Sequence, residues 1–163
     1  MRLFQPFSTL AVAAALVLGV AHWAGAQTLS QTQIRELMVN TTSAHCEFSL
    51  MAVGTWSRTG EPTAEVKPAT LTADFLEVDT SDGTASIETD FGVQFIIARQ
   101  SQGYLHFLYV ASTGPVYTTT IFDRPAGEGR YLATHSRHEF TQVSLPGFTS
   151  RPEQYYGWCE MTE

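Results

Sequence analysis

The segment His135-Ser-Arg-His138-Glu139 brings two imidazoles and a carboxylate within five residues. Such groups are common ligands of zinc and other transition metals. On a strand, however, residues 135 and 138 point to opposite faces, whereas the histidines of an HExxH metalloprotease motif lie one helical turn apart on the same face. The alternative is a bulge that brings both histidines to one face, where His45 or His106 would complete a metal site. The spacing favours surface histidines, so we expect no metal and no other cofactor.

Nucleophilic catalysis also lacks its usual motifs in this chain. There is no Gly-x-Ser-x-Gly elbow, and two cysteines that pair with each other leave no free thiolate. Acid-base catalysis by paired carboxylates stays open, because 16 acidic residues always allow some pair to meet in space. We therefore predict no catalytic residue and expect a protein that is not an enzyme, with a hydrolase of unfamiliar motif as the alternative.

The acidic residues are concentrated in one part of the chain. The formal net charge is −7, which disfavours nucleic acid as a partner because phosphate binding needs clustered Lys and Arg. No basic residue occurs between Lys67 and Arg99, so this segment predicts an acidic hairpin that keeps the protein soluble or, alternatively, binds a basic protein partner. The acidic residues of this segment are Asp74, Glu77, Asp79, Asp82, Glu88 and Asp90.

The amino-terminal segment has the pattern of an export signal. Arg2 supplies a positive end, residues 10–20 form an unbroken apolar run, and Ala24-Gly25-Ala26 is a small-x-small cleavage site. The run is short for a membrane span, which needs about 20 apolar residues, so an uncleaved anchor is the weaker alternative. We expect cleavage of residues 1–26, no stable membrane insertion of the remaining chain, and one domain over 27–163 in the periplasm or outside the cell.

Export determines how the two cysteines are interpreted. In an oxidising compartment Cys46 and Cys159 have only each other as partners, so we predict one disulfide. The bond would join the beginning of the folded region to its end.

The periodicity of apolar residues predicts one helix followed by strands. Ser30 and Gln33 form a capping-box pattern, which predicts a helix over about 31–40. Its apolar stripe consists of Ile34, Leu37 and Met38.

From Cys46 onward the period becomes two, and short turns separate about eight strands without a helical crossover. This pattern predicts an all-β fold, an antiparallel meander closed into a barrel-like sheet, with a β-sandwich as the alternative. A bond between the first and last strands favours closure, because it requires their Cα atoms to lie within about 7 Å. Residues expected to share a face include Phe48, Leu50 and Ala52 on one strand, and Phe91, Val93, Phe95 and Ile97 on another.

Gly54-Thr55-Trp56 resembles the Gly-x-Trp on the first strand of lipocalins and related barrels. In that family the tryptophan closes one end of the barrel beneath a short amino-terminal helix. The resemblance covers three residues, and the ordinary alternative is a core or edge tryptophan on a strand.

As a whole, the chain also resembles small exported β proteins of alphaproteobacteria. The resemblance depends on the signal peptide, the cysteine near the start of the mature chain, the meander, and the final Tyr155-x-Gly157-x-Cys159-Glu160 strand. It implies a periplasmic protein of bacterial origin stabilised by a disulfide, and it brings no catalytic residue with it.

These features together predict an exported binding protein. The first hypothesis places a small apolar ligand inside the sheet, and the alternative is a periplasmic interaction or inhibitor protein that uses the acidic hairpin against a basic partner. The competing interpretation is an ordinary core filled by the same aromatic side chains, which is fully compatible with eight strands. The candidate ligand-lining residues are Trp56, Phe95, Tyr104, Phe107, Tyr109 and Trp158.

Overall fold

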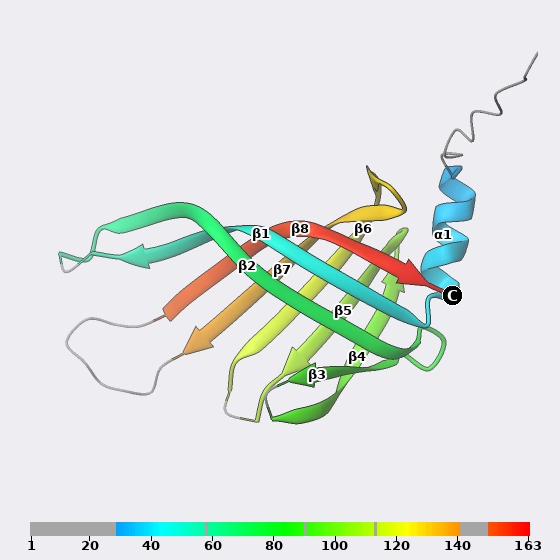
Figure 1. Cartoon of the computed structure of the whole chain (residues 1–163). Coiled ribbons are helices and arrows are strands. Elements are labelled where there is room, and N and C mark those ends of the chain that lie inside the picture. The colour runs from blue at the N-terminus through cyan, green and yellow to red at the C-terminus, as the bar shows by residue number, and fades with distance from the viewer. Residues whose placement is uncertain (1–28, 58, 90, 113, 141–149) are drawn as a thin grey trace, which may run out of the picture.

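A computed structural model describes residues 29–57, 59–89, 91–112, 114–140 and 150–163 of the chain. The predicted signal segment, residues 1–26, lies outside the described residues. Within the residues that the structure describes, one helix stands beside a continuous sheet of eight strands (Figure 1).

Helix α1 spans Gln31–Asn40, as the sequence predicted. The backbone N–H of Gln33 donates to Ser30 Oγ at 3.3 Å, and the backbone N–H of Ser30 donates to Gln33 Oε1 at 2.9 Å. This reciprocal pair satisfies amides that the first turn of a helix otherwise leaves without acceptors. Ile34 and Met38 lie one turn apart and are fully buried, so packing holds this ten-residue helix in place. No helix in the described ranges is long and apolar enough to cross a bilayer.

The eight strands form an antiparallel meander, which confirms the predicted fold class. Each strand pairs with the next along the chain, and the last pairs with the first, so the hydrogen-bonded ladder closes on itself. A sandwich of two separate sheets is therefore excluded. The strands are β1 (Ser43–Trp56), β2 (Pro62–Asp79), β3 (Thr84–Thr89), β4 (Gly92–Ser101), β5 (Tyr104–Val110), β6 (Val116–Gly127), β7 (Arg130–Phe140) and β8 (Ser150–Thr162).

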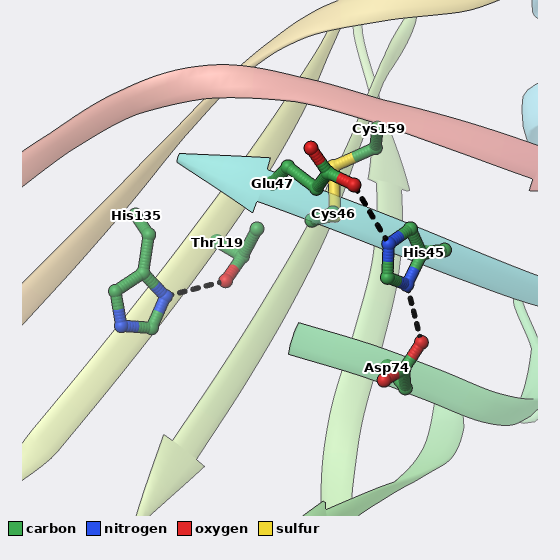
Figure 2. Close-up of a disulfide and its surroundings, with 7 residues drawn as sticks. All are labelled: His45, Cys46, Glu47, Asp74, Thr119, His135 and Cys159. Carbon is green, nitrogen blue, oxygen red and sulfur yellow. Dashed lines mark hydrogen bonds and ion pairs between the residues drawn. A yellow bond between two sulfur atoms is a disulfide. The ribbon is translucent and has the colours of Figure 1, made fainter. Parts of the chain in front are cut away.

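The predicted disulfide lies at the seam where β8 closes the sheet on β1 (Figure 2). Cys46 and Cys159 are directly opposite in the antiparallel register, with their Cα atoms 4.0 Å apart. Both side chains are fully buried, and their inward direction fixes which alternate residues of the two seam strands face the interior.

The predicted face of β1 differs from the observed one. In β1 the register shifts between Phe48 and Leu50, so Leu50 points outward and is exposed, while Met51 and Val53 are buried. Such a bulge adds one residue on one strand and reverses the alternation after it. The sequence offers apolar residues on both sides of this point, so periodicity alone did not locate the bulge.

The two ends of the closed sheet are different. Helix α1 lies at the end where β1 begins and β8 finishes (Figure 1). There the Thr80 hydroxyl donates to the carbonyl of Val39 at 2.7 Å, which ties the turn after β2 to the helix. Beneath α1 the interior is filled, since Leu105 and Ile121 are fully buried beside the helix residues. The other end, where β3 turns into β4 and β5 into β6, has no such helix among the described residues.

Candidate functional site

The half of the interior away from α1 contains a cavity of about 650 Å³. Strands β2 to β7 contribute its lining, mostly from the residues that alternate toward the inside. At its outer rim lie Thr89 and Phe91 from the β3–β4 turn and Ala111 and Ser112 from the segment after β5. The cavity therefore opens at the end of the sheet opposite the helix.

Two stacked phenylalanines form the floor of the cavity. The rings of Phe75 on β2 and Phe107 on β5 lie 3.9 Å apart and within 3° of parallel. Because these strands are not neighbours in the sheet, the stack bridges the interior. Residues farther toward α1, such as Leu105, do not line the cavity. The stack thus separates the cavity from the filled core under the helix.

Aromatic and aliphatic side chains make up the walls above this floor. Tyr109 and Tyr117 face each other across the β5–β6 pair, with ring centroids 5.6 Å apart and planes 16° from parallel. Opposite them, Leu71, Ile87 and Ile96 supply aliphatic surface from β2, β3 and β4. This lining suits an apolar ligand with flat or flexible hydrocarbon parts.

A polar group on β6 and β7 interrupts the apolar wall. The ring Nδ1 of His135 lies 2.8 Å from the Thr119 hydroxyl, and both side chains are buried (Figure 2). Burial, with a smaller contribution from the positive charge of Arg137, lowers the pKa of His135 to about 4. At neutral pH His135 is therefore an uncharged hydrogen-bonding group.

Arg137 lines the same wall, two residues beyond His135 on β7. Its guanidinium carbon lies 5.7 Å from the ring centroid of Tyr117, its partner in the register of β6 and β7. This contact with an aromatic face supports the cation beside the cavity.

The position of His135 corrects one prediction. His135 and His138 do point to opposite faces, but only His138 is at the surface, because the inward face of β7 borders the cavity. Within the described ranges, no group of three His, Cys, Asp or Glu residues is arranged to hold a metal ion.

Two of the six predicted ligand-lining residues, Phe107 and Tyr109, line the cavity. Phe95 does not, because it points outward and is 85% exposed while its neighbour Ile96 points inward. The sequence of β4 is apolar on both faces, so periodicity could not distinguish the inner face from the outer one.

The other three candidates also lie away from the cavity. Tyr104 packs edge-on against Phe122 with ring centroids 5.3 Å apart, and Arg130 lies over the Trp158 ring at 4.7 Å. Trp56 is 51% exposed at the end of β1 far from α1, unlike the lipocalin tryptophan that closes the barrel beneath the helix. None of these three side chains lines the cavity.

The acidic hairpin residues are spread along the sheet, and three of them have partners within it. The Asp79 carboxylate accepts hydrogen bonds from the backbone N–H groups of Ser81 and Asp82, both at 2.9 Å, and so shapes the β2–β3 turn near α1. A hydrogen bond from the Ser81 hydroxyl at 2.6 Å, together with these backbone bonds, lowers the pKa of Asp79. Two further acids have side-chain partners, Asp74 with His45 at 2.6 Å and Glu77 with Ser86 at 3.4 Å.

Two further described acids of this segment lie at opposite ends of the sheet. Asp82 is exposed in the β2–β3 turn, and Glu88 lies at the cavity rim at the other end of the sheet. Asp90 lies outside the described residues.

Sequence analysis missed the polar members of the cavity wall. Thr119, His135 and Arg137 occupy inward positions of their strands, where polar residues are uncommon. The alternation along β7 could have revealed the last two of them. Tyr131 and Ala133 lie on the same face of the strand as His135 and Arg137, so an inward face for the first two places the second two inward as well.

Comparison with known proteins adds no assignment. No protein-family model matches the sequence, and a search of curated proteins finds no significantly similar one.

Proposed function

We propose that this protein binds a small apolar ligand in the cavity of its closed sheet. The observation that carries the proposal is the cavity itself, whose volume of about 650 Å³ lies within the range of about 300–1,000 Å³ typical of ligand pockets. Its walls are mostly apolar and aromatic, with Thr119, His135 and Arg137 as polar groups on the β6–β7 side and Gln94 as a polar group on β4. That combination is typical of sites that bind a hydrophobic molecule in one orientation.

The contrast between the two halves of the interior supports a binding role over an ordinary core. An eight-stranded barrel is narrow enough for its own side chains to fill it. Beneath α1 they do so, with Ile34, Met38 and Ile121 fully buried. The other half, with strands of the same sheet, leaves space above the Phe75–Phe107 stack.

The place of action is part of the proposal: the periplasm or the exterior of the cell. The Cys46–Cys159 disulfide is compatible with an exported protein, because such bonds persist in oxidising compartments. Mass analysis of the protein purified from its own host tests this, with a mature chain that begins at Gln27 as the expected result. A chain that retained residues 1–26 would contradict it.

Binding is tested with the neutral fluorescent probe N-phenyl-1-naphthylamine and a pair of variants. Gln94 lies half-buried on the inner face of β4 and lines the cavity, whereas its neighbour Val93 points outward and is 59% exposed. Gln94→Trp places a large ring in the cavity, and Val93→Trp places the same ring on the surface.

We expect the wild type and Val93→Trp to bind the probe with similar affinity and Gln94→Trp to bind it at least tenfold more weakly. Far-ultraviolet circular dichroism checks that both variants fold. Absence of saturable probe binding by the wild type, or equal affinities for folded Gln94→Trp and Val93→Trp, would overturn the cavity as the binding site.

A further inference from the structure

The charges that border the cavity are unequally placed. Among the described lining residues, Arg137 is the one cation, and the one anion is Glu88, an exposed side chain on β3 at the rim. Arg137 pairs in register with Tyr117 near the start of β6, so it lies toward the open end of the cavity. The floor, formed by Phe75 and Phe107, lies toward α1. A ligand in the cavity therefore meets a cation near the entrance and hydrocarbon at the bottom.

We propose that the ligand is an amphipathic carboxylic acid, bound with its carboxylate at Arg137 and His135 and its apolar body directed toward the Phe75–Phe107 floor. This inference rests on the proposed function, since it names the class of molecule that the cavity takes.

Arg137 has the chemistry to hold a carboxylate. A guanidinium carries five N–H donors in a planar fork that matches the two carboxylate oxygens, and such charge-assisted pairs are among the stronger hydrogen bonds in proteins. The group is held in place from two sides, by the Tyr117 ring and by a hydrogen bond with Tyr155. The Tyr155 hydroxyl itself donates to Glu153 Oε2 at 2.7 Å. Because a guanidinium has five donors, it can bind a ligand carboxylate while it keeps contacts to protein groups.

His135 supplies a second, neutral contact. In a neutral imidazole one ring nitrogen donates and the other accepts. A carboxylate requires the tautomer in which the Thr119 hydroxyl donates to Nδ1, across the observed 2.8 Å, and Nε2–H donates to the ligand. Residues 135 and 137 lie on one face of β7, about 7 Å apart along the strand. The low pKa of His135 keeps the ring neutral at physiological pH, so the positive charge of the site resides on Arg137.

The volume limits the size of the ligand. At about 30 Å³ per heavy atom, the share of one water molecule in the liquid, a cavity of about 650 Å³ accommodates roughly 20 non-hydrogen atoms. Medium-chain fatty acids and aromatic acids of similar size meet this limit.

The experiment compares dodecanoate with its methyl ester, which has nearly the same body but no charge. The affinity of each compound is measured by its competition with bound N-phenyl-1-naphthylamine, in the wild type and in the variants Arg137→Gln and Arg124→Gln. Arg124 is an exposed arginine on β6 near α1, so its substitution removes the same charge at the opposite end of the sheet.

We expect the wild type and Arg124→Gln to bind dodecanoate at least tenfold more tightly than the ester, and Arg137→Gln to lose this preference. Should Arg137→Gln fail to fold, Arg137→Lys keeps the charge without the fork and is expected to retain part of the preference. Probe binding by the wild type with no preference for the acid would overturn this inference and leave the proposed function standing. A preference that survived in folded Arg137→Gln would overturn the role of Arg137, and absence of any probe binding would refute the proposed function.

Discussion

Gly157 lies where β8 packs tightly against the backbone of β1, and a single methyl group there should destabilise the fold. A Cβ added at Gly157 would lie 1.9 Å from the carbonyl oxygen of Glu47 and 2.7 Å from the Cα of Phe48. Both atoms belong to the backbone of β1, so no side chain can rotate away to make room. The disulfide between Cys46 and Cys159 holds the same two strands together, two residues from the contact.

The expected loss of stability follows from two opposing effects. Forcing an extra carbon into a packed region costs about 1–3 kcal/mol, and contacts with backbone belong at the upper end of that range. Replacing Gly by Ala also reduces the entropy of the unfolded chain, which stabilises the protein by about 0.4–1 kcal/mol. We therefore expect Gly157→Ala to lower the free energy of unfolding by about 2 kcal/mol.

Urea unfolding followed by circular dichroism measures this change, and Gly54→Ala is the matched control. Gly54 lies on β1 of the same seam, but a Cβ there would meet only Pro152 Cγ at 3.9 Å, an ordinary contact. With a slope of about 1–3 kcal/mol per molar urea, Gly157→Ala should shift the midpoint downward by roughly 1 M. Gly54→Ala should leave the midpoint unchanged or raise it slightly. If the two variants had equal midpoints, the argument from strand approach at Gly157 would be refuted.

Three further predictions concern the seam and two histidines. Cys46→Ala combined with Cys159→Ala should lower the free energy of unfolding by up to about 5 kcal/mol, the chain-entropy value for a separation of 113 residues; reductant should shift only the wild type, and an unchanged urea midpoint in the double variant would contradict this. The pKa of His135 is about 4 in the folded state and 6.5 in the unfolded chain. The neutral ring therefore contributes roughly 3 kcal/mol to the free energy of unfolding above pH 6.5, and this contribution is lost as pH falls toward 4. Unfolding at pH 7 and pH 4.5 should show a smaller difference for His135→Gln than for the wild type, and equal differences would speak against a buried neutral ring. The hydrogen bond to Asp74 raises the pKa of His45, so the contribution of His45 to the free energy of unfolding is present below pH 6.5 and is lost as pH rises through the pKa of the folded state. His45→Gln should remove this decrease in stability between pH 6 and pH 8. A decrease that persisted in the variant would assign it to another group.

Local chemistry in the sequence was enough to predict the elements of this fold and the bond at its seam. The Ser30 and Gln33 pair identified the start of α1, because a capping box depends on residues three positions apart. The change of period after Cys46 identified an antiparallel meander. Two cysteines with no other partner identified the Cys46–Cys159 disulfide.

The cavity and its polar wall were decided only when the sheet closed. Whether Phe95 or Ile96 faces the interior depends on the register of the closed sheet, and a strand that is apolar on both faces does not encode that choice locally. His135 became a buried group for the same reason, since closure turned its face of β7 inward. The space inside depends on the sizes of side chains that come from six strands at once, and no single segment of the sequence specifies that sum.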